Sequence, residues 1–333
     1  MSLPINVVVV TYNSAADIVP CLRSIGQNGA VPVVVDNGST DDTLALVRRE
    51  CPSCVIVSSP ANGYARAINL GAQRCSGDFM AFSNADVVFP PGSLLALTRF
   101  VERNPSVGVA GPQQVFPDGA WQRSWGVTPG IPEALLELFG ITTIWGELRR
   151  ALWPRRLNRA PRDVGYLDGA VLVVSRSAFD AVSGFDDSFE FYAEESDFCM
   201  RVRHAGWRIV AVPRVTIVHH RGGSSTQSTM SAERHVELLV RANRKLILKH
   251  YDETYYARYV ALKWLFYSGW GKLLRLMRWV FPSRRREQLT NKIALHECYA
   301  RQLAAERKAC RNQPLRDSVV ATTRTRHHTK QQS

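Results

Sequence analysis

The chain has 333 residues, of which 45% are hydrophobic and 21% charged, so wholesale disorder, a collagen-like helix and a coiled coil are excluded. No apolar run is long enough to predict a simple membrane-spanning helix. The formal net charge of +13 is uneven, because residues 1–240 hold 21 basic and 23 acidic side chains and residues 241–333 hold 21 and 6. A uniformly basic nucleic-acid binder is therefore disfavoured, and a neutral body with a basic, anion-seeking appendage is indicated.

The start of the chain predicts a cytoplasmic protein. Residues 1–6 lack the basic segment that precedes the apolar region of a signal peptide. The seven cysteines are scattered and odd in number, which is typical of reduced thiols.

The first 110 residues alternate between strands and helices. Strands are expected at 5–10, 31–35, 55–57 and 78–83, and helices at 17–29, 41–49, 65–75 and 92–104. This alternation predicts an α/β fold with a Rossmann-like, mostly parallel central sheet and flanking helices. Ligands bind such sheets at the carboxyl ends of the strands.

The rest of the chain changes character twice. Residues 112–165 are rich in Pro, Trp and Arg, and further elements are expected as an apolar helix near 133–152 and strands at 165–174, 209–212 and 215–219. From about Met230 the sequence is helical, basic and aromatic, and beyond about 303 it has the polar composition of a disordered tail. We therefore expect a sheet domain at 1–229, a helical extension at 230–302 and a disordered basic tail at 303–333.

Polar residues follow two of the predicted strands. Asp36 could accept the ring N–H of a uracil or thymine, or could simply form a turn or cap a helix. Asp86, in Asn84-Ala85-Asp86, could hold Mg²⁺ or Mn²⁺ that bridges a diphosphate, or could lie in a surface turn. No glycine-rich turn follows Val10, which argues against a nicotinamide-dependent dehydrogenase.

Two further clusters could carry chemistry. Glu194 and Glu195 lie in an acidic stretch without an obvious local partner, whereas Asp197 has Arg201 four residues later. A carboxylate with a tuned pKa could act as general base for a sugar hydroxyl, and the alternative is a solvated helix start. His219 and His220 follow a strand, where a histidine could bind metal or phosphate or be a plain loop residue.

Eight motifs keep a common order and spacing: Val9–Asn13, Val34–Asp41, Asn62–Gly71, Asn84–Asp86, Leu167–Ala170, Gly184–Asp187, Phe191–Arg201 and His219–Ser224. Over roughly residues 5–250 the chain resembles the family 2 glycosyltransferases of GT-A fold, and most of all their rhamnosyltransferase branch. It departs from that branch in having Ala67 and Ala85 where glycine and proline are frequent, and Glu195 where the family usually has aspartate.

The resemblance implies a role for each matching residue. The nucleotide-sugar would be bound by Thr11, Asn13, Asp36, Asn62, Gly63, Asn84 and Asp86. Asp86 and His219 would hold a divalent metal, Mg²⁺ or Mn²⁺, although His220 also fits the motif. Asp168, Gly169 and Ala170 would shape the acceptor side. The general base would be Glu195 at the second position of the acidic pair, with Glu194 as the open alternative.

The implied activity is inverting transfer of a sugar, L-rhamnose in that branch, from a nucleotide-diphosphate sugar to a glycan or lipid-linked acceptor. This reaction would serve bacterial surface polysaccharide synthesis. Two alternatives remain open: a protein that binds nucleic acid through its basic tail, with no specific nucleic acid expected, and an inactive GT-A scaffold.

The segment 270–281 is typical of a basic amphipathic helix. Lys272, Arg275 and Arg278 recur every three residues on one face, and apolar residues occupy the opposite face. Such a helix lies flat on an anionic bilayer, so we expect peripheral attachment to the inner face of the cell membrane. The alternative is that the apolar face packs on the sheet domain or on a second subunit.

Overall fold

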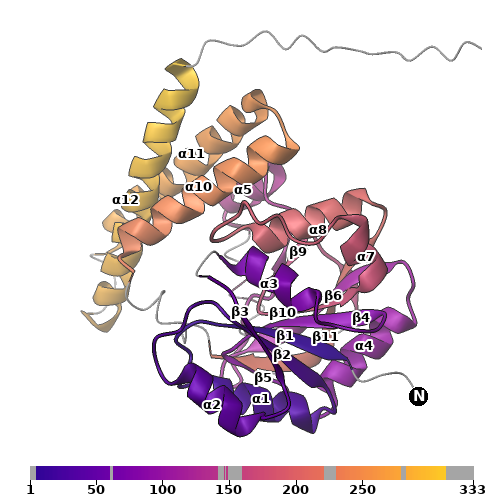
Figure 1. The fold of residues 1–333 in the computed structure, drawn as a ribbon. Helices are drawn as coiled ribbons and strands as arrows, with labels where there is room; N and C mark the ends of the chain where they lie inside the picture. The colour runs from indigo at the N-terminus through magenta and orange to yellow at the C-terminus, as the bar shows by residue number, and fades with distance from the viewer. Residues whose placement is uncertain are drawn as a thin grey trace, which may run out of the picture.

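The computed structural model describes residues 5–60, 63–141, 146, 148, 160–220, 230–278 and 283–312. A sheet flanked by helices forms one part, and three long C-terminal helices form a second part beside it (Figure 1).

The first half of the sheet domain follows the predicted alternation. Its elements are β1 (Asn6–Thr11), α1 (Ile18–Gln27), β2 (Val31–Asp36), α2 (Thr43–Glu50), β3 (Val55–Ser58), α3 (Tyr64–Ala72), β4 (Phe79–Asn84) and α4 (Ser93–Glu102). β1 pairs in parallel with both β2 and β4, and β2 pairs in parallel with β3. The β-branched runs therefore form the centre of a parallel sheet, as the sequence predicted.

The second half adds the strands that make the sheet mixed. Its elements are β5 (Val87–Val88), β6 (Val107–Val115), β7 (Trp125–Gly126), α5 (Ile131–Leu138), β8 (Arg162–Asp163), β9 (Tyr166–Leu167), β10 (Val171–Ser175), α7 (Arg176–Ala181), α8 (Glu194–His204) and β11 (Arg208–His219). The strand order is β3-β2-β1-β4-β10-β6-β11-β5, and β8 also pairs with β11. β10 runs antiparallel to β4 and β6, whereas β6 and β11 are parallel.

Three sequence predictions for this half are wrong in detail. The strand expected at 165–174 is divided, because β9 leaves the main sheet to pair with β7 and residues 168–170 form a loop before β10. The two strands expected at 209–212 and 215–219 are one strand, β11, with a register irregularity between Val212 and Thr216. The helix expected near 133–152 is interrupted by a turn at 139–140 after α5 (Ile131–Leu138), and of residues 142–152 only 146 and 148 are described, both of them helical.

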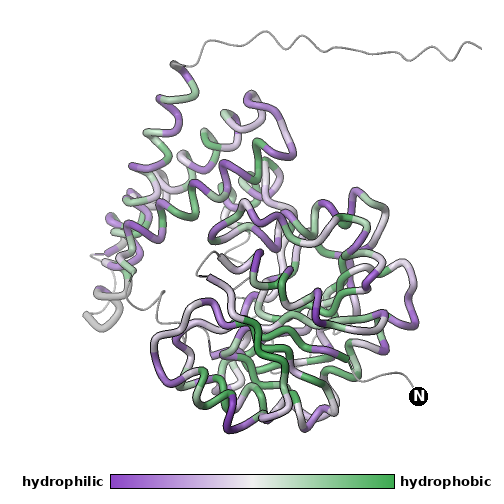
Figure 2. Tube along the Cα trace, viewed as in Figure 1, coloured by the Kyte–Doolittle hydropathy of each residue, from purple (hydrophilic) through white to green (hydrophobic). Residues whose placement is uncertain are grey.

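The core has two layers, one on each face of the sheet. Val7 and Val9 of β1 pack with α1, α2 and α4, whereas Val8 packs with α3, α7 and α8. A Cβ atom on Gly71 of α3 would lie 2.3 Å from Val8 Cγ1, so the glycine permits the close approach of this helix to the sheet. Hydrophobic residues concentrate in the central strands (Figure 2). This burial on both faces explains why the strands are apolar throughout rather than alternating.

The helical extension consists of α10 (Ala232–His250), α11 (Glu253–Met277) and α12 (Ser283–Asn312), and α11 packs against both α12 and α5. The disordered tail predicted from residue 303 is wrong for 303–312. α12 continues because Leu303 is buried, Glu306 accepts a hydrogen bond of 2.9 Å from Tyr256 and Arg307 lies over the ring of Trp264. Residues 313–333 lie outside the described part of the chain.

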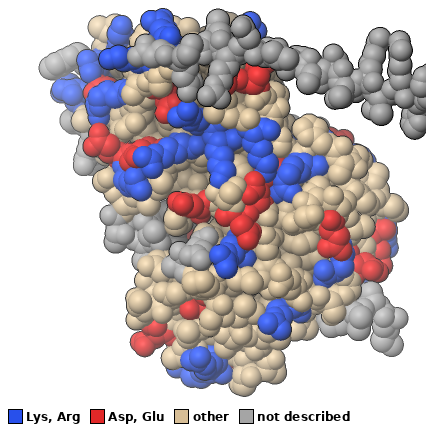
Figure 3. All heavy atoms as spheres, turned by 45° about the horizontal axis from the view of Figure 1, so that its top comes forward, with Lys and Arg blue, Asp and Glu red and all other residues tan. Residues whose placement is uncertain are grey.

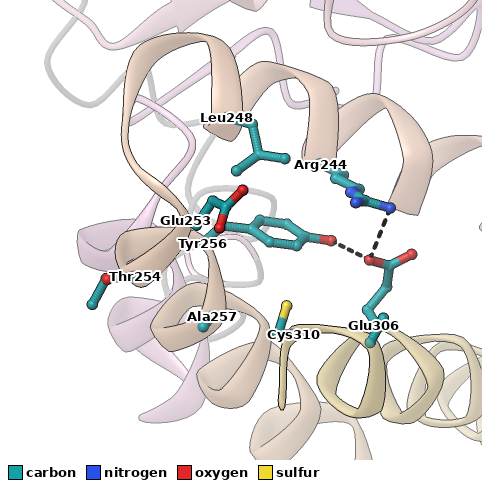
Figure 4. Close-up of a pocket in the computed structure, with 9 residues that line it drawn as sticks. Arg244, Leu248, Glu253, Thr254, Tyr256, Ala257, Glu306 and Cys310 are labelled. Carbon is teal, nitrogen blue, oxygen red and sulfur yellow. Dashed lines mark hydrogen bonds and ion pairs between the residues drawn. The ribbon is translucent and has the colours of Figure 1, made fainter. Parts of the chain in front are cut away.

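A small cavity of about 160 Å³ lies between these helices (Figure 4). Its polar wall is formed by Glu306, which Tyr256 and Arg244 both approach. Within the residues that the structure describes, no helix has the length and apolar character needed to cross a bilayer.

Asp197 of α8 connects the two parts of the molecule. Its side chain is completely buried and lies 2.7 Å from Arg201 Nε, 2.8 Å from Lys249 Nζ and 2.8 Å from His250 Nε2. The predicted helical pair of Asp197 and Arg201 is therefore confirmed. Burial raises the pKa of Asp197, but the bonds from His250, Lys249 and Arg201 outweigh it and hold the pKa below its ordinary value.

We expect Asp197→Ala to lower the free energy of unfolding by about 3–5 kcal/mol, because it leaves the partly buried Arg201 and His250 without the fully buried carboxylate that they bond. The matched control is Asp163→Ala, which removes a pair of hydrogen bonds with Arg208. The side chain of Asp163 is 63% exposed and that of Arg208 is 48% exposed. That surface pair should contribute less than about 1 kcal/mol. Urea denaturation measures both, and equal losses would contradict a connecting role for Asp197.

Candidate active site

The carboxyl ends of β1 and β2 meet at one edge of the sheet. Thr11 and Asp36 are paired in the register of these strands, and both are buried. The carboxylate oxygens of Asp36 accept from the backbone N–H of Ser39 at 3.3 and 3.2 Å. Among the described residues, no hydrogen-bond partner reaches the buried Thr11 Oγ1. This edge therefore offers a fixed carboxylate and an unused hydroxyl.

The loops that follow these two strands are tied together. Asn13 has a positive φ of 45°, its N–H donates to Ser39 Oγ at 2.9 Å, and its Oδ1 accepts from the N–H of Thr40 at 2.8 Å. The structure thus brings the predicted residues Thr11, Asn13 and Asp36 together.

The predicted donor-site loop precedes α3. Asn62 lies outside the described residues, and Gly63 has a φ of +96°. A Cβ atom on Gly63 would lie 2.7 Å from the carbonyl oxygen of Glu190, so the glycine permits close contact with the acidic segment before α8.

Asp86 and His219 are brought together by strand pairing. Asp86 follows β4, and His219 ends β11 opposite Val87 of β5. His219 Nε2 lies 3.3 Å from Asp86 Oδ1, and both side chains are largely buried. His220 points elsewhere, with its Nδ1 lying 3.2 Å from Asp17 Oδ1. The structure therefore places His219 rather than His220 beside the predicted metal ligand.

This pair fits a divalent cation that arrives with a ligand. One carboxylate oxygen and one imidazole nitrogen 3.3 Å apart could occupy neighbouring coordination positions. In the described ranges, no group of three or more His, Cys, Asp or Glu could hold a metal by itself. The remaining positions would thus fall to diphosphate oxygens and water, as is usual for Mg²⁺ in phosphate-binding enzymes.

The loop between β9 and β10 contains the predicted acceptor-side residues. Asp168 Oδ1 accepts from the N–H of Ala170 at 3.2 Å, and the carbonyl of Ala170 accepts from the N–H of Asn84 at 3.1 Å. A Cβ atom on Gly169 would lie 3.7 Å from Glu195 Cβ. The acceptor-side loop therefore lies between the end of β4 and the start of α8.

Glu194 and Glu195 begin α8 after two residues of positive φ, Tyr192 and Ala193. Glu194 is buried, no described residue reaches its Oε2, and burial raises its pKa to about 7. Burial, followed by the charges of Glu194 and Asp168, raises the pKa of Glu195 well above its ordinary value. The alternative of a solvated helix start is therefore wrong for the buried Glu194, and burial shifts the pKa values of both carboxyls upward.

Tyr64 is a site residue to which sequence reasoning gave no role. Its hydroxyl donates to the carbonyl oxygen of Gly169 at 2.9 Å. Burial, followed by the charges of the two glutamates, Asp168 and Asp86, raises its pKa well above the ordinary value. The phenol therefore lies among all four carboxylates. The sequence signal that could have identified Tyr64 is its position inside the motif Asn62–Gly71.

Comparisons with known proteins show which family the chain belongs to. The model of the family described as "Glycosyl transferase family 2" matches residues 6–182. The N-acetylglucosaminyl-diphospho-decaprenol L-rhamnosyltransferase of Mycobacterium tuberculosis (strain ATCC 25618 / H37Rv) is 32% identical over 250 residues, which cover 68% of this chain and 78% of that protein. The pre-mycofactocin glycosyltransferase of the same strain is 28% identical over 221 residues, 65% of this chain and 42% of that protein.

Solved structures share the fold at low sequence identity. The mannosyltransferase PcManGT of Pyrobaculum calidifontis, solved with GDP-Man and Mn²⁺, aligns with a TM-score of 0.55 and 18% identity over 92% of this chain and 88% of its own. GalNAc-T7, solved with UDP, GalNAc and Mn²⁺, aligns with a TM-score of 0.54 and 13% identity over 92% and 57%. The expected GT-A fold is thereby confirmed. Since the family model covers more than half of the chain, the protein belongs to glycosyltransferase family 2 and is a glycosyltransferase similar to bacterial rhamnosyltransferases.

Proposed function

We propose that this enzyme is an inverting transferase that moves L-rhamnose from a nucleotide-diphosphate sugar to a hydroxyl of a lipid-linked glycan in bacterial surface polysaccharide synthesis. The observation that supports it most is the position of loop 168–170, which bonds to Asn84 at the end of β4, two residues before Asp86, and lies against Glu195 at the start of α8. The sugar and the acceptor are those in the name of the mycobacterial relative. This concentration of functional groups favours an active enzyme over an inactive scaffold.

The nucleotide would lie over the ends of β1 and β2. Asp36 would accept the ring N–H of the base, and Thr11 Oγ1 would gain a polar partner that the described part of the chain does not supply. Asn13 would contact the ribose from the tied loops. Asn84 and Gly63 would border the diphosphate and the sugar.

Asp86 and His219 would hold the divalent metal against the diphosphate. When bound, the metal would neutralise the negative charge that grows on the departing nucleoside diphosphate. The burial of both side chains supports this role, because charge interactions strengthen where water is excluded.

Glu195 would act as the general base. Its Oε would take the proton of the acceptor hydroxyl while the hydroxyl oxygen bonds to the anomeric carbon and the bond from that carbon to the diphosphate oxygen breaks. Attack from the face opposite the diphosphate gives a single inversion. Glu195 rather than Glu194 is favoured because Gly169 of the acceptor-side loop lies against it. A base with a raised pKa is suited to proton transfer near neutral pH.

The helical extension would dock on the inner face of the cell membrane. Leu273 and Leu276 of α11 are 43% and 74% exposed, and Phe139, which follows α5, is 70% exposed. Phe139 is next to Gly140, and a Cβ atom on Gly140 would lie 3.1 Å from the ring of Trp270 in α11. The end of α5 therefore lies beside α11. We name Phe139, Leu273 and Leu276 the apolar edge.

The structure also limits this membrane proposal. Trp264 and Trp270 pack within the helical extension, and Arg275 Nε donates to Glu297 of α12 at 2.7 Å, so part of the predicted amphipathic surface serves helix packing. Residues 279–282 lie outside the described chain. Lys and Arg side chains nevertheless gather over the extension on the face seen in Figure 3. A helical extension that carries both exposed apolar and basic side chains suits an anionic lipid surface, and no specific nucleic acid is proposed as a partner.

Metal-dependent donor binding tests the proposal without knowledge of the acceptor. A panel of nucleotide-sugars is screened for Mn²⁺-dependent binding and slow hydrolysis, and one donor should give both. Asp86→Ala should lower turnover by about 10²-fold or more, because it removes the charge that positions the metal. Full activity of Asp86→Ala in excess chelator would rule out the metal role.

Glu195→Gln keeps the shape of the side chain and removes its proton affinity, so kcat should fall by about 10²-fold or more while the donor Kd stays unchanged. Steady-state kinetics and donor titration measure the two quantities. A silent Glu195→Gln together with a damaging Glu194→Gln would reverse the assignment within the pair. If neither change mattered, the pair would be structural.

The dependence of kcat/KM on pH tests the same assignment, with Glu194→Gln as the matched control. A base acts when deprotonated, so kcat/KM should rise with pH through the raised pKa of Glu195. Glu194→Gln removes the neighbouring charge that helps to raise that pKa, and the rising limb should therefore move to lower pH with turnover largely kept.

Membrane attachment is checked by pelleting the protein with anionic liposomes. The wild type should bind at low salt and be released at high salt, because surface charge attraction is screened. Phe139→Glu combined with Leu276→Glu should reduce the bound fraction severalfold, whereas Leu95→Glu, at a 45% exposed leucine of α4 in the sheet domain, should not. No binding by the folded wild type at low salt would leave packing as the role of these helices.

A further inference from the structure

Two adjacent glutamines are buried at the end of an otherwise largely apolar strand. Gln113 and Gln114 of β6 are 0% and 1% exposed. Burying an amide without hydrogen bonds is costly, so each must be satisfied inside the protein. β6 pairs in parallel with β11, and Gln114 stands opposite Ile217, two residues before His219. Gln113 and Gln114 thus lie on the strand next to the one that ends at the proposed metal ligand His219.

Gln114 contacts the imidazole directly. Its Oε1 lies 2.9 Å from His219 Nδ1. An amide oxygen only accepts, so Nδ1 must carry the ring proton. In a neutral imidazole Nε2 then holds a lone pair, and Nε2 is the atom that faces Asp86 at 3.3 Å. The contact therefore leaves His219 in the form that can bind a metal beside Asp86.

Other buried polar groups hold the surroundings of His219. Gln122 Nε2 donates to the carbonyl oxygen of His219 at 2.6 Å. Gln113 Nε2 donates to the carbonyl oxygen of Gln122 at 2.5 Å and to Ser124 Oγ at 2.8 Å. Trp121 Nε1 donates to Gln113 Oε1 at 3.0 Å. We name Gln113, Gln114, Trp121, Gln122 and Ser124 the glutamine network; it fixes the backbone of His219 while Gln114 fixes the ring.

We propose that Gln114 is a positioning residue that selects the tautomer of His219 and so prepares Nε2 to bind the divalent metal together with Asp86. This rests on the metal role proposed above for Asp86 and His219. The opposite arrangement has a distinct chemistry. If the proton were on Nε2, His219 would donate to Asp86 and could not bind a metal through that atom. Partners of metal-binding histidines typically affect metal affinity by about 10–100-fold.

The first test measures metal binding rather than activity. Mn²⁺ is titrated into the full-length protein in the presence of UDP, GDP or dTDP in turn, and free Mn²⁺ is followed by its electron paramagnetic resonance signal. Gln114→Leu, which removes the acceptor, should weaken Mn²⁺ binding by about 10–100-fold. Gln114→Glu keeps an acceptor at Nδ1 and should restore most of the affinity.

Gln113→Leu is the matched control, because it removes a buried amide of the same network that does not contact the imidazole. It should keep Mn²⁺ affinity close to that of the wild type. An equal loss in Gln113→Leu would attribute the effect to the network as a whole and overturn the specific role of Gln114. Wild-type affinity in Gln114→Leu would overturn it as well.

The second test needs no substitution at Gln114 and so does not depend on the folding of a variant. ¹⁵N-histidine NMR of the wild-type protein reports which ring nitrogen is protonated, and His219→Gln identifies the signals. In the neutral ring a proton on Nδ1 alone supports the inference and a proton on Nε2 alone overturns it, so spectra are recorded up to a pH at which the ring carries a single proton. Asp86→Ala separates this result from the proposed function. If Asp86→Ala kept full Mn²⁺ affinity, the proposed metal site itself would be wrong. If Asp86→Ala lost Mn²⁺ affinity while Gln114→Leu kept it, only the role of Gln114 would be refuted.

Discussion

Parallel pairing of β1 with β2 and with β4 ends three strands at the same edge of the sheet, and the candidate active site depends on this constraint. The register pairs Thr11 with Asp36 and Val10 with Asn84, so polar residues that are far apart in the sequence become neighbours. Burial of the strands on both faces makes this register difficult to shift, because a slip by one residue would exchange the two core layers. The packing of the hydrophobic core therefore fixes the positions of the polar residues at the strand ends.

The antiparallel strand β10 completes the site. It enters the sheet between β4 and β6, and the loop before it carries residues 168–170 to the end of β4. Gly169 there lies against Glu195, and its carbonyl accepts from Tyr64. This one loop thus contacts the end of β4, the start of α8 and Tyr64 of α3. The change of strand direction at β10 brings the loop to this edge of the sheet.

Three carboxylates within one turn of α8 show how surroundings set charge. Burial raises the pKa values of Glu194 and Glu195, and only backbone hydrogen bonds oppose this rise. Asp197, equally removed from water, has a lowered pKa because His250, Lys249 and Arg201 bond to it. The same helix therefore supplies a pair suited to proton transfer and an ionised carboxylate that attaches the helical extension.

The sequence by itself determined the fold class and the strand-end positions of Asp36 and Asp86. These follow from local patterns: β-branched runs fix strands, and polar residues just after them must lie at the sheet edge. Only the tertiary structure decided that His219 rather than His220 faces Asp86, that Gln114 bonds to His219, and that α12 continues to Asn312. Such choices depend on strand register and on contacts between residues that can be more than a hundred positions apart. The local pattern of hydrophobic and polar residues carries no information about these contacts.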